Sequence, residues 1–384
     1  MEIDHDIPTV LAVLRTEAPS ELAGEFYTME DLWERRLWHQ LTDVLVRVFA
    51  APASGPVRMR LFVQFVSTFE AKVNQLKLVG LALLAADERV AGTEDSLAFM
   101  DEIARKVQEA GAQDAYVYAL IEVARIRLVQ KDLDGALATM DKANAILDTF
   151  DAVDKTIHAA YYRVNADYYK AKSDFAAYYR HSLRYLACIS LADLPAAEQR
   201  ERAYDLAVAA LLGETIYNFG EILLHPVLES LRTGETAWLR DALFAFHSGD
   251  IPAFEALLPQ MTTLPILASS AEFLRQKICL MALIEAVFKR PPSDRTLPFA
   301  TIATETRLVL EEVEHLVMKA LSLGLLRGSI DQVAQTVTIT WLQPRVMTKD
   351  QIESMRQRLV DWDASVSQLS SWMEGVGKDI WAVV

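Results

Sequence analysis

The residue types that could carry out chemistry do not occur in the arrangements that catalysis requires. The seven histidines, at positions 5, 39, 158, 181, 225, 247 and 315, form no H-x-H, H-x-x-H or H-E-x-x-H pair, so the common zinc motifs are missing. No phosphate-binding loop of the G-x-G-x-x-G or G-x-x-x-x-G-K type occurs, and neither does a G-x-S-x-G nucleophile motif. The sequence therefore predicts a protein that is not an enzyme, with no cofactor and no catalytic, cofactor-binding or metal-binding residues.

Two pairs of residues do have a spacing that metal ligands use. Glu312 and His315 form a Glu-x-x-His step, and Glu221 lies one helical turn before His225. A carboxylate-bridged two-metal site needs two such helices and further glutamates. We expect Glu312 and His315 on a solvated helix face, and we expect His225, just before Pro226, to be a hydrogen-bonded structural residue.

The overall composition fits an acidic protein that works inside the cell. The chain has 53 acidic and 38 basic residues, which disfavours nucleic acid as the main partner because its affinity depends largely on Lys and Arg.

Cys188 and Cys279 each lie in an apolar stretch, and we expect both to be buried thiols in a reducing compartment. Acidic residues near the N-terminus argue against a secretory signal, and no apolar run is long enough to predict a membrane span.

Apolar residues recur at helical spacing through most of the chain. Asp132-Leu133, Asp174-Phe175 and Asp250-Ile251 each open a new apolar run, at separations of 42 and then 76 residues. These separations are close to one and two repeats of about 38 residues, a length that helix-pair repeats use. The pattern predicts a mainly α fold that begins as a helical-repeat solenoid of the TPR or HEAT kind, with each Asp at the start of a helix.

The pattern changes after Phe288, where a turn-rich stretch begins. We predict a short helix over 299–304 and a longer one over 310–323, followed by Gly324 as a helix C-cap. Two apolar or β-branched stretches, 325–330 and 337–341, flank a polar turn and predict a two-stranded hairpin. Together these elements predict a winged-helix module.

The last predicted element is an amphipathic helix over 349–374. Its apolar residues are spaced alternately three and four apart, as in the seam of a coiled coil: Ile352, Met355, Leu359, Trp362, Val366, Leu369 and Met373. We call these seven residues the seam. The strict period favours docking onto partner helices, and packing back onto its own domain is the alternative.

A winged helix raises the possibility of DNA binding, because such modules often place a helix in the major groove. The helix that would enter the groove, 310–323, begins with Glu311, Glu312 and Glu314, and only Lys319 balances them. Phosphates repel carboxylates. The sequence thus favours packing against protein.

The order of helical array, winged helix and terminal helix resembles that of PCI-domain proteins, the scaffold subunits of the proteasome lid, the COP9 signalosome and a translation initiation factor. Longer strings resemble one lid family, the non-ATPase regulatory subunit 13 family. They include Leu211-Leu212-Gly213-Glu214, Asn218-Phe219-Gly220-Glu221, His225-Pro226-Val227-Leu228 and Gln343-Pro344-Arg345-Val346.

The resemblance implies three domains: N-terminal helical repeats over 1–170, a PCI domain over 171–346 and a C-terminal helix and tail over 347–384. Within the PCI domain the helical part would end at about 288 and the winged helix would cover about 296–346. The strand containing Val337, Ile339 and Trp341 would be an edge strand, free to pair with a partner.

The resemblance also implies a function and partners. The chain would be a cytoplasmic and nuclear scaffold subunit of the 26S proteasome lid, needed for lid assembly and for positioning the deubiquitinase in ubiquitin-dependent degradation. Its partners would be other PCI-domain lid subunits and an MPN-domain deubiquitinase pair, with a ubiquitin receptor subunit nearby, and neither nucleic acid nor membrane.

Other readings of the sequence stay open. One is a PCI scaffold of the signalosome or the initiation factor, which the strings above disfavour. Another is a nucleic-acid-binding winged-helix adaptor, and a third is an enzyme whose site would appear only as a cleft of perturbed titratable groups.

Overall fold

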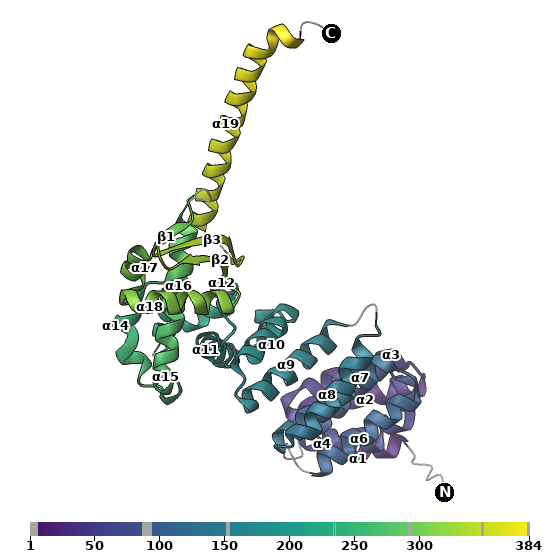
Figure 1. Ribbon diagram of the computed structural model, residues 1–384. Coiled ribbons are helices and arrows are strands. Elements are labelled where there is room, and N and C mark those ends of the chain that lie inside the picture. The colour runs from purple at the N-terminus through teal and green to yellow at the C-terminus, as the bar shows by residue number, and fades with distance from the viewer. Residues whose placement is uncertain are drawn as a thin grey trace. The chain divides into compact units, whose positions relative to one another are not determined.

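The structure, a computed structural model, describes residues 7–86, 94–150, 154–232, 234, 236–290, 294–346 and 349–381. It consists of helices and one small antiparallel sheet (Figure 1), which confirms the predicted mainly α class. The chain divides into two compact units, Met1–Leu194 and Pro195–Val384. None of the helices in the described ranges is both long and apolar enough to cross a membrane.

Helices are the only regular secondary structure in the described residues of the first unit. Its α-helices are α1 (Ile7–Glu17), α2 (Ala23–Glu34), α3 (Trp38–Ala50), α4 (Gly55–Gln64), α5 (Gln75–Ala86), α6 (Glu94–Glu109), α7 (Gln113–Val129), α8 (Leu133–Leu147), α9 (Lys155–Lys172) and α10 (Phe175–Cys188). Shorter 3₁₀ turns are η1 (Ser20–Leu22), η2 (Pro52–Ser54), η3 (Val66–Lys72) and η4 (Leu191–Asp193).

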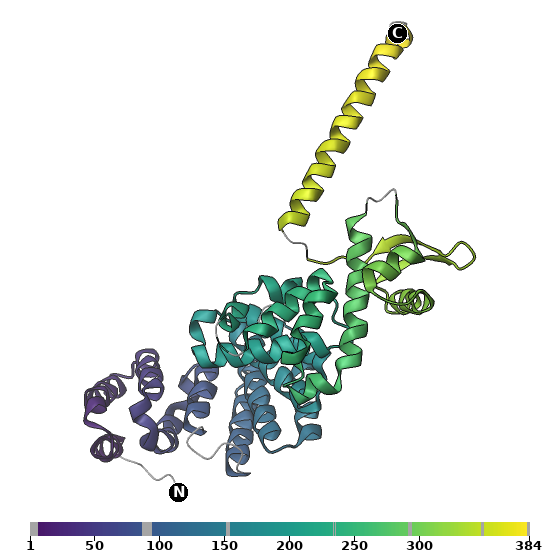
Figure 2. The ribbon, with the colours of Figure 1, turned by 90° about the vertical axis from the view of Figure 1, so that its left-hand side faces the viewer.

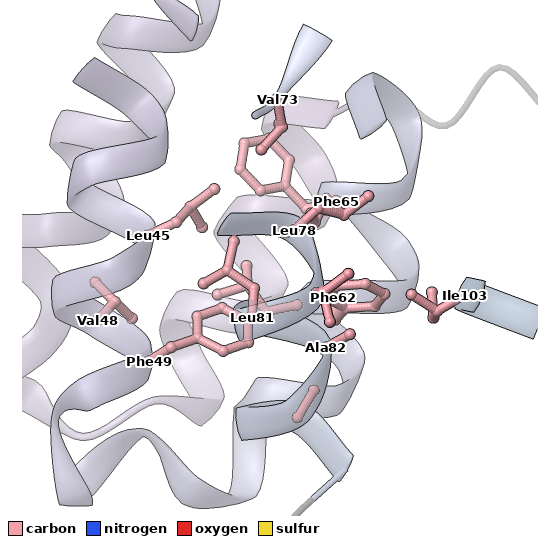
Figure 3. Packing of buried hydrophobic residues seen from close by; sticks show 14 of the residues in the cluster. Leu45, Val48, Phe49, Phe62, Phe65, Val73, Leu78, Leu81, Ala82 and Ile103 are labelled. Atoms are coloured by element: carbon pink, nitrogen blue, oxygen red, sulfur yellow. The ribbon is translucent and has the colours of Figure 1, made fainter. Parts of the chain in front are cut away.

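The core of the first unit is built by apolar stripes on neighbouring helices. On α3, apolar residues at helical spacing are all buried: Leu41, Val44, Leu45, Val48 and Phe49. Figure 3 shows part of this packing, in which Leu45, Val48 and Phe49 lie across from Leu78 and Leu81 of α5.

An aromatic cluster joins α2, α3 and the chain after α4. The ring centroids of Trp33 lie 5.2 Å from Trp38, 5.5 Å from Phe65 and 5.3 Å from Phe69. The rings meet at tilted or edge-on angles, which suit their quadrupoles.

The three aspartates that the repeat pattern singled out are all helix N-caps. Oδ1 of Asp132, Asp174 and Asp250 accepts the backbone N–H of the residue three positions later, at 3.0, 3.0 and 3.1 Å. This bond satisfies one of the free amides of a helix start, and it confirms that each Asp opens a helix.

Each of these caps follows a residue in the left-handed conformation: Lys131, Ser173 and Gly249 have φ of 65°, 62° and 66°. At Gly249 a side chain is also excluded by packing, because an added Cβ would lie 2.6 Å from Cα of Ala282. The same local turn therefore recurs, and glycine is required at one copy because another helix passes close to it.

The second unit contains a helical part, the sheet and the terminal helix. Its helices are α11 (Ala196–Leu212), α12 (Gly220–Leu224), η5 (Pro226–Leu231), α13 (Ala237–Ser248), α14 (Ile251–Met261), α15 (Pro265–Ser269), α16 (Ala271–Lys289), α17 (Phe299–Thr306), α18 (Leu310–Ser322) and α19 (Lys349–Trp381). Its strands are β1 (Thr296–Pro298), β2 (Leu326–Asp331) and β3 (Thr336–Leu342).

The predicted winged helix is present, with α17 and α18 beside the sheet (Figure 2). Both helices and both hairpin strands lie within two residues of the predicted bounds. Gly324 has φ of 69°, the left-handed conformation expected of the C-cap glycine.

The prediction that Val337, Ile339 and Trp341 form an edge strand was wrong. The strand order is β1-β3-β2, so β3 lies in the middle of the sheet. Val337 pairs with Leu297 on one side and with Ile330 on the other, and Ile339 donates its amide to the carbonyl of Arg295. The backbone of β3 around Val337 and Ile339 is therefore paired on both sides, so a partner strand cannot be added there.

The division into compact units falls at Leu194/Pro195, whereas the sequence places the start of the PCI domain at 171. Position 171 lies within α9. The domain limits at 170, 346 and 347 describe family domains and stay predictions.

Candidate protein-interaction surfaces

The terminal helix α19 exposes its whole apolar face. All seven seam residues are exposed, with exposed fractions from 44% for Val366 to 67% for Trp362. Figures 1 and 2 show α19 as one long helix. Nothing among the described residues covers the seam, which is how the docking surface of a helix looks before its partners bind.

The apolar face of α19 is longer and wider than the predicted seam. Val376 continues the alternating spacing by one step and is 61% exposed, while Val360 and Trp372 widen the face. The spacing rule that identified the first seven residues also identifies Val376. Val360 and Trp372 lie beside the seam rather than on it, so a strict heptad rule omits them.

Charged side chains occupy other positions of α19 and are exposed. Arg356 and Glu353 form an ion pair at 2.6 Å. Their mutual hydrogen bond lowers the pKa of Glu353 and raises that of Arg356. An exposed pair of this kind contributes little to stability.

A buried ion pair fixes the chain just before α19. Arg345 pairs with Glu285 of α16, and their side chains are only 6% and 12% exposed. The guanidinium also lies 4.9 Å from the ring centroid of Phe288. We call this contact the Arg345 anchor. Arg345 and Glu285 are 60 positions apart, so no local sequence pattern could have paired them.

The residue after the anchor is also held. The amide of Val346 donates to Oδ1 of Asn218 at 3.3 Å, and the same oxygen accepts the amide of Gly220 at 3.2 Å. A Cβ on Gly220 would lie 2.3 Å from Cβ of Val346, so only glycine allows this approach. The helical part of the unit therefore determines where the chain leaves for α19.

A second buried cation, Lys277, lies in the helical part of the same unit. Its side chain is 1% exposed, and Nζ donates to the carbonyls of Ala210, Leu211 and Gly213 at 2.8, 3.0 and 2.7 Å. These carbonyls belong to the C-terminal end of α11, where a positive charge is favourable. Burial lowers the pKa of Lys277 to about 7.

Three family models match successive parts of the chain. PSD13 N-terminal repeats match residues 25–243, the PCI domain matches 257–341, and the Rpn9 C-terminal helix matches 345–377. The chain is 47% identical over 365 residues to the probable 26S proteasome regulatory subunit rpn9 of Schizosaccharomyces pombe, a match that covers 95% of each chain.

The chain belongs to the Rpn9/PSD13 family. It is also 40% identical over 392 residues to the 26S proteasome regulatory subunit RPN9 of Saccharomyces cerevisiae, covering 98% of this chain and 99% of that protein. The resemblance read from the sequence is thereby confirmed.

The sequence alone left open that this chain is a PCI subunit of a translation initiation factor, and a weaker similarity to such a subunit exists. The chain is 27% identical over 193 residues to eukaryotic translation initiation factor 3 subunit M of Aspergillus terreus, covering 49% of this chain and 41% of that protein. Identity is lower and coverage is about half, so this relationship is more distant than the one to Rpn9.

The Rpn9 C-terminal helix match includes the entire seam. It begins at residue 345, the arginine of the anchor, and ends at 377, after Val376. The segment that the family model describes is thus the segment that the structure anchors at one end and leaves uncovered along its apolar face.

The winged helix of this Rpn9-family chain presents acidic groups at the start of α18. Glu311 and Glu312 are exposed there, while Nζ of Lys319 donates to Oε1 of Gln276 at 2.6 Å. The one basic residue of this helix is therefore held by α16. This arrangement opposes phosphate binding.

Glu312 and His315 are exposed on α18, as predicted. Nδ1 of His225 accepts the amide of Val227 at 3.2 Å, which confirms its predicted structural role. Across the described ranges, no three His, Cys, Asp or Glu side chains are grouped so that they could hold a metal ion.

The two cysteines differ in burial. Cys279 is buried as expected, but Cys188 is only half-buried because it lies at the end of α10, beside a groove.

Proposed function

We propose that this chain is a non-enzymatic scaffold subunit of the 26S proteasome lid, and that α19 joins it to other PCI-domain lid subunits. The observation that carries the proposal is the uncovered seam, which lies wholly within the match to the Rpn9 C-terminal helix. Its relatives are 26S proteasome regulatory subunits by name, over nearly their whole length.

The amount of apolar surface on α19 supports a bundle of helices as its partner. Burying a large apolar side chain stabilises by about 1.5–3 kcal/mol. Covering the seven seam residues would therefore contribute on the order of 10 kcal/mol, against which the ordering of both partners must be set. A contact of this size suits a permanent assembly.

The same proposal includes the finer roles of the subunit. The PCI winged helix joins those of sister subunits, and the assembled lid positions an MPN-domain deubiquitinase pair, with a ubiquitin receptor subunit nearby, for ubiquitin-dependent degradation. The subunit works in the cytoplasm and nucleus and binds neither nucleic acid nor membrane. The acidic start of α18 supports the exclusion of nucleic acid.

The seam is tested by a double substitution, Leu359→Asp with Trp362→Asp, in the tagged full-length chain expressed in its own cells. Two carboxylates in an apolar interface have no counter-charge, so we expect this variant to be missing from purified 26S particles in native mass spectrometry. Wild-type chain should purify with other PCI subunits, an MPN-domain deubiquitinase and the proteasomal ATPases in equal copy.

The matched control is Gln357→Asp with Ala364→Asp, which adds the same charges on the other side of α19. The control variant should enter the particle normally. Normal incorporation of the seam variant would contradict the role of the seam. Purification of the wild-type chain alone or with RNA would contradict the proteasomal assignment.

A further inference from the structure

A groove lies within the first unit, and Cys188 is part of its lining. It has a volume of about 810 Å³ and is walled by α5, α7, α9 and the chain that follows α10. This volume is in the range of about 300–1,000 Å³ that ligand sites occupy. All of its lining residues lie between Val46 and Asp193, within one compact unit.

The lining charge of the groove is opposite to that of the chain. Four basic side chains line it, Lys77, Arg125, Lys155 and Arg163, against the two acidic ones of Glu122 and Asp193. The chain as a whole has a net charge of -15. A basic concave site in an acidic protein attracts negatively charged partners and repels further copies of the same chain.

Two of these basic side chains already take part in ion pairs within the chain. Nε of Arg125 pairs with Glu122 at 2.6 Å, and Nζ of Lys77 pairs with Asp43 at 2.7 Å. Lys155 is exposed at the start of α9. Its ammonium group is therefore the basic group best placed to meet a carboxylate from outside.

The floor of the groove is apolar. Leu81, Leu84, Ala159, Ala160 and Val164 contribute to it. Such a floor suits side chains such as Leu or Phe and gives nothing to a nucleic-acid backbone.

Tyr118 adds a neutral hydrogen-bonding group to this lining. Burial, with the nearby charge of Glu122, raises the pKa of Tyr118 to about 12. Its hydroxyl is protonated at neutral pH and can donate to a carboxylate.

Gly80 keeps the groove open. It lies in the middle of α5, where glycine disfavours the helix relative to alanine. No atom would lie within 4 Å of a Cβ at this position, so the fold does not require glycine there. The missing side chain instead leaves room on the wall of the groove.

We propose that this groove binds a short acidic segment of a partner protein, whose apolar side chains rest on the floor while a carboxylate faces Lys155. Charge, apolar floor and the open space at Gly80 together point to this occupant. The proposal concerns the first unit only and does not depend on the role of α19.

The test uses the full chain and a fluorescent peptide of about twelve residues in which Glu alternates with Leu. We expect saturable binding by anisotropy that weakens as salt rises, because exposed charges are screened. Gly80→Leu should abolish this binding by filling the groove. Lys155→Glu should weaken it by about tenfold and reduce its salt dependence.

Two control variants keep the test independent of folding. Gly24→Leu places the same side chain at another open helical position, and Lys142→Glu reverses another exposed charge of the same unit. Both should bind the probe as wild type does. Lys155→Glu places a carboxylate at a helix start, where it favours the fold, and circular dichroism should show all four variants folded.

Four outcomes would overturn the proposal. They are no binding of the acidic probe, equal binding of a probe with Lys in place of Glu, tighter binding of a single-stranded oligonucleotide, and unchanged binding by folded Gly80→Leu. Loss of the seam variant from the proteasome would change none of these results, so the two proposals fail separately.

Discussion

Helices α3 and α19 carry the same kind of sequence pattern and have opposite environments. Both place apolar residues three and four positions apart. On α3 those residues are at most 5% exposed, whereas on α19 the seam is at least 44% exposed. The pattern thus specifies that a helix face is to be buried, and it does not specify whether the covering helices belong to the same chain.

The largest expected effect contrasts these two helices directly. Phe49→Ala on α3 should lower the free energy of unfolding by about 3–5 kcal/mol, because it leaves a cavity in a packed core. Leu359→Ala on α19 should leave the stability of the isolated chain unchanged. Urea unfolding followed by circular dichroism measures both, and equal losses would mean that α19 packs within its own chain.

A somewhat smaller loss of stability is expected at the Arg345 anchor, and it tests whether this ion pair is buried in solution. Glu285→Ala removes one partner of a buried ion pair and should cost about 3 kcal/mol, because the guanidinium is left without its counter-charge. The exposed pair on α19 is the control, and Glu353→Gln there should have no measurable effect. A similar small change for both variants would show that the anchor is not buried in solution.

Lys277 adds a pH dependence that the apolar core cannot produce. The pKa of Lys277 is about 7 in the folded chain and 10.5, its ordinary value, in the unfolded chain. Between these two pH values Lys277 is therefore protonated more often in the unfolded chain than in the folded chain. Stability of the wild type should therefore rise relative to Lys277→Met as the pH increases from about 7 to 10, by at most about 1.4 kcal/mol per pH unit. Below pH 7 the difference should be constant. Parallel stability curves from pH 6 to about 10 would contradict the shift.

The smallest expected loss of stability comes from removing a single helix N-cap in the helical repeats. Asp132→Ala removes the cap of α8 and should cost about 1 kcal/mol. Asp132→Asn, which keeps an accepting oxygen, should restore most of that loss. If both variants were equally stable, the hydrogen bond to Gly135 would have no energetic role.

Local signals in the sequence were sufficient for much of the fold. The caps at Asp132, Asp174 and Asp250, the C-cap at Gly324 and the terminal helix depend on neighbours within a few residues. Each could be read without knowing what lies elsewhere in the chain.

What the sequence did not reveal depends on distant contacts. Strand β1 has three residues, too few to show a periodic pattern, and missing it made β3 look like an edge strand. The Arg345 anchor and the carbonyls around Lys277 join residues 60 or more positions apart. The basic groove gathers side chains from several helices, so spacing along one helix gives no hint of it.

The uncovered apolar face of α19 limits the concentration of unassembled chain that a cell can tolerate. Two free copies expose matching apolar stripes, and their pairing increases with the square of the free concentration. Partner helices at sufficient concentration compete with that pairing by mass action. Synthesis in step with the partners would therefore protect the free chain from aggregation as well as supply the assembly.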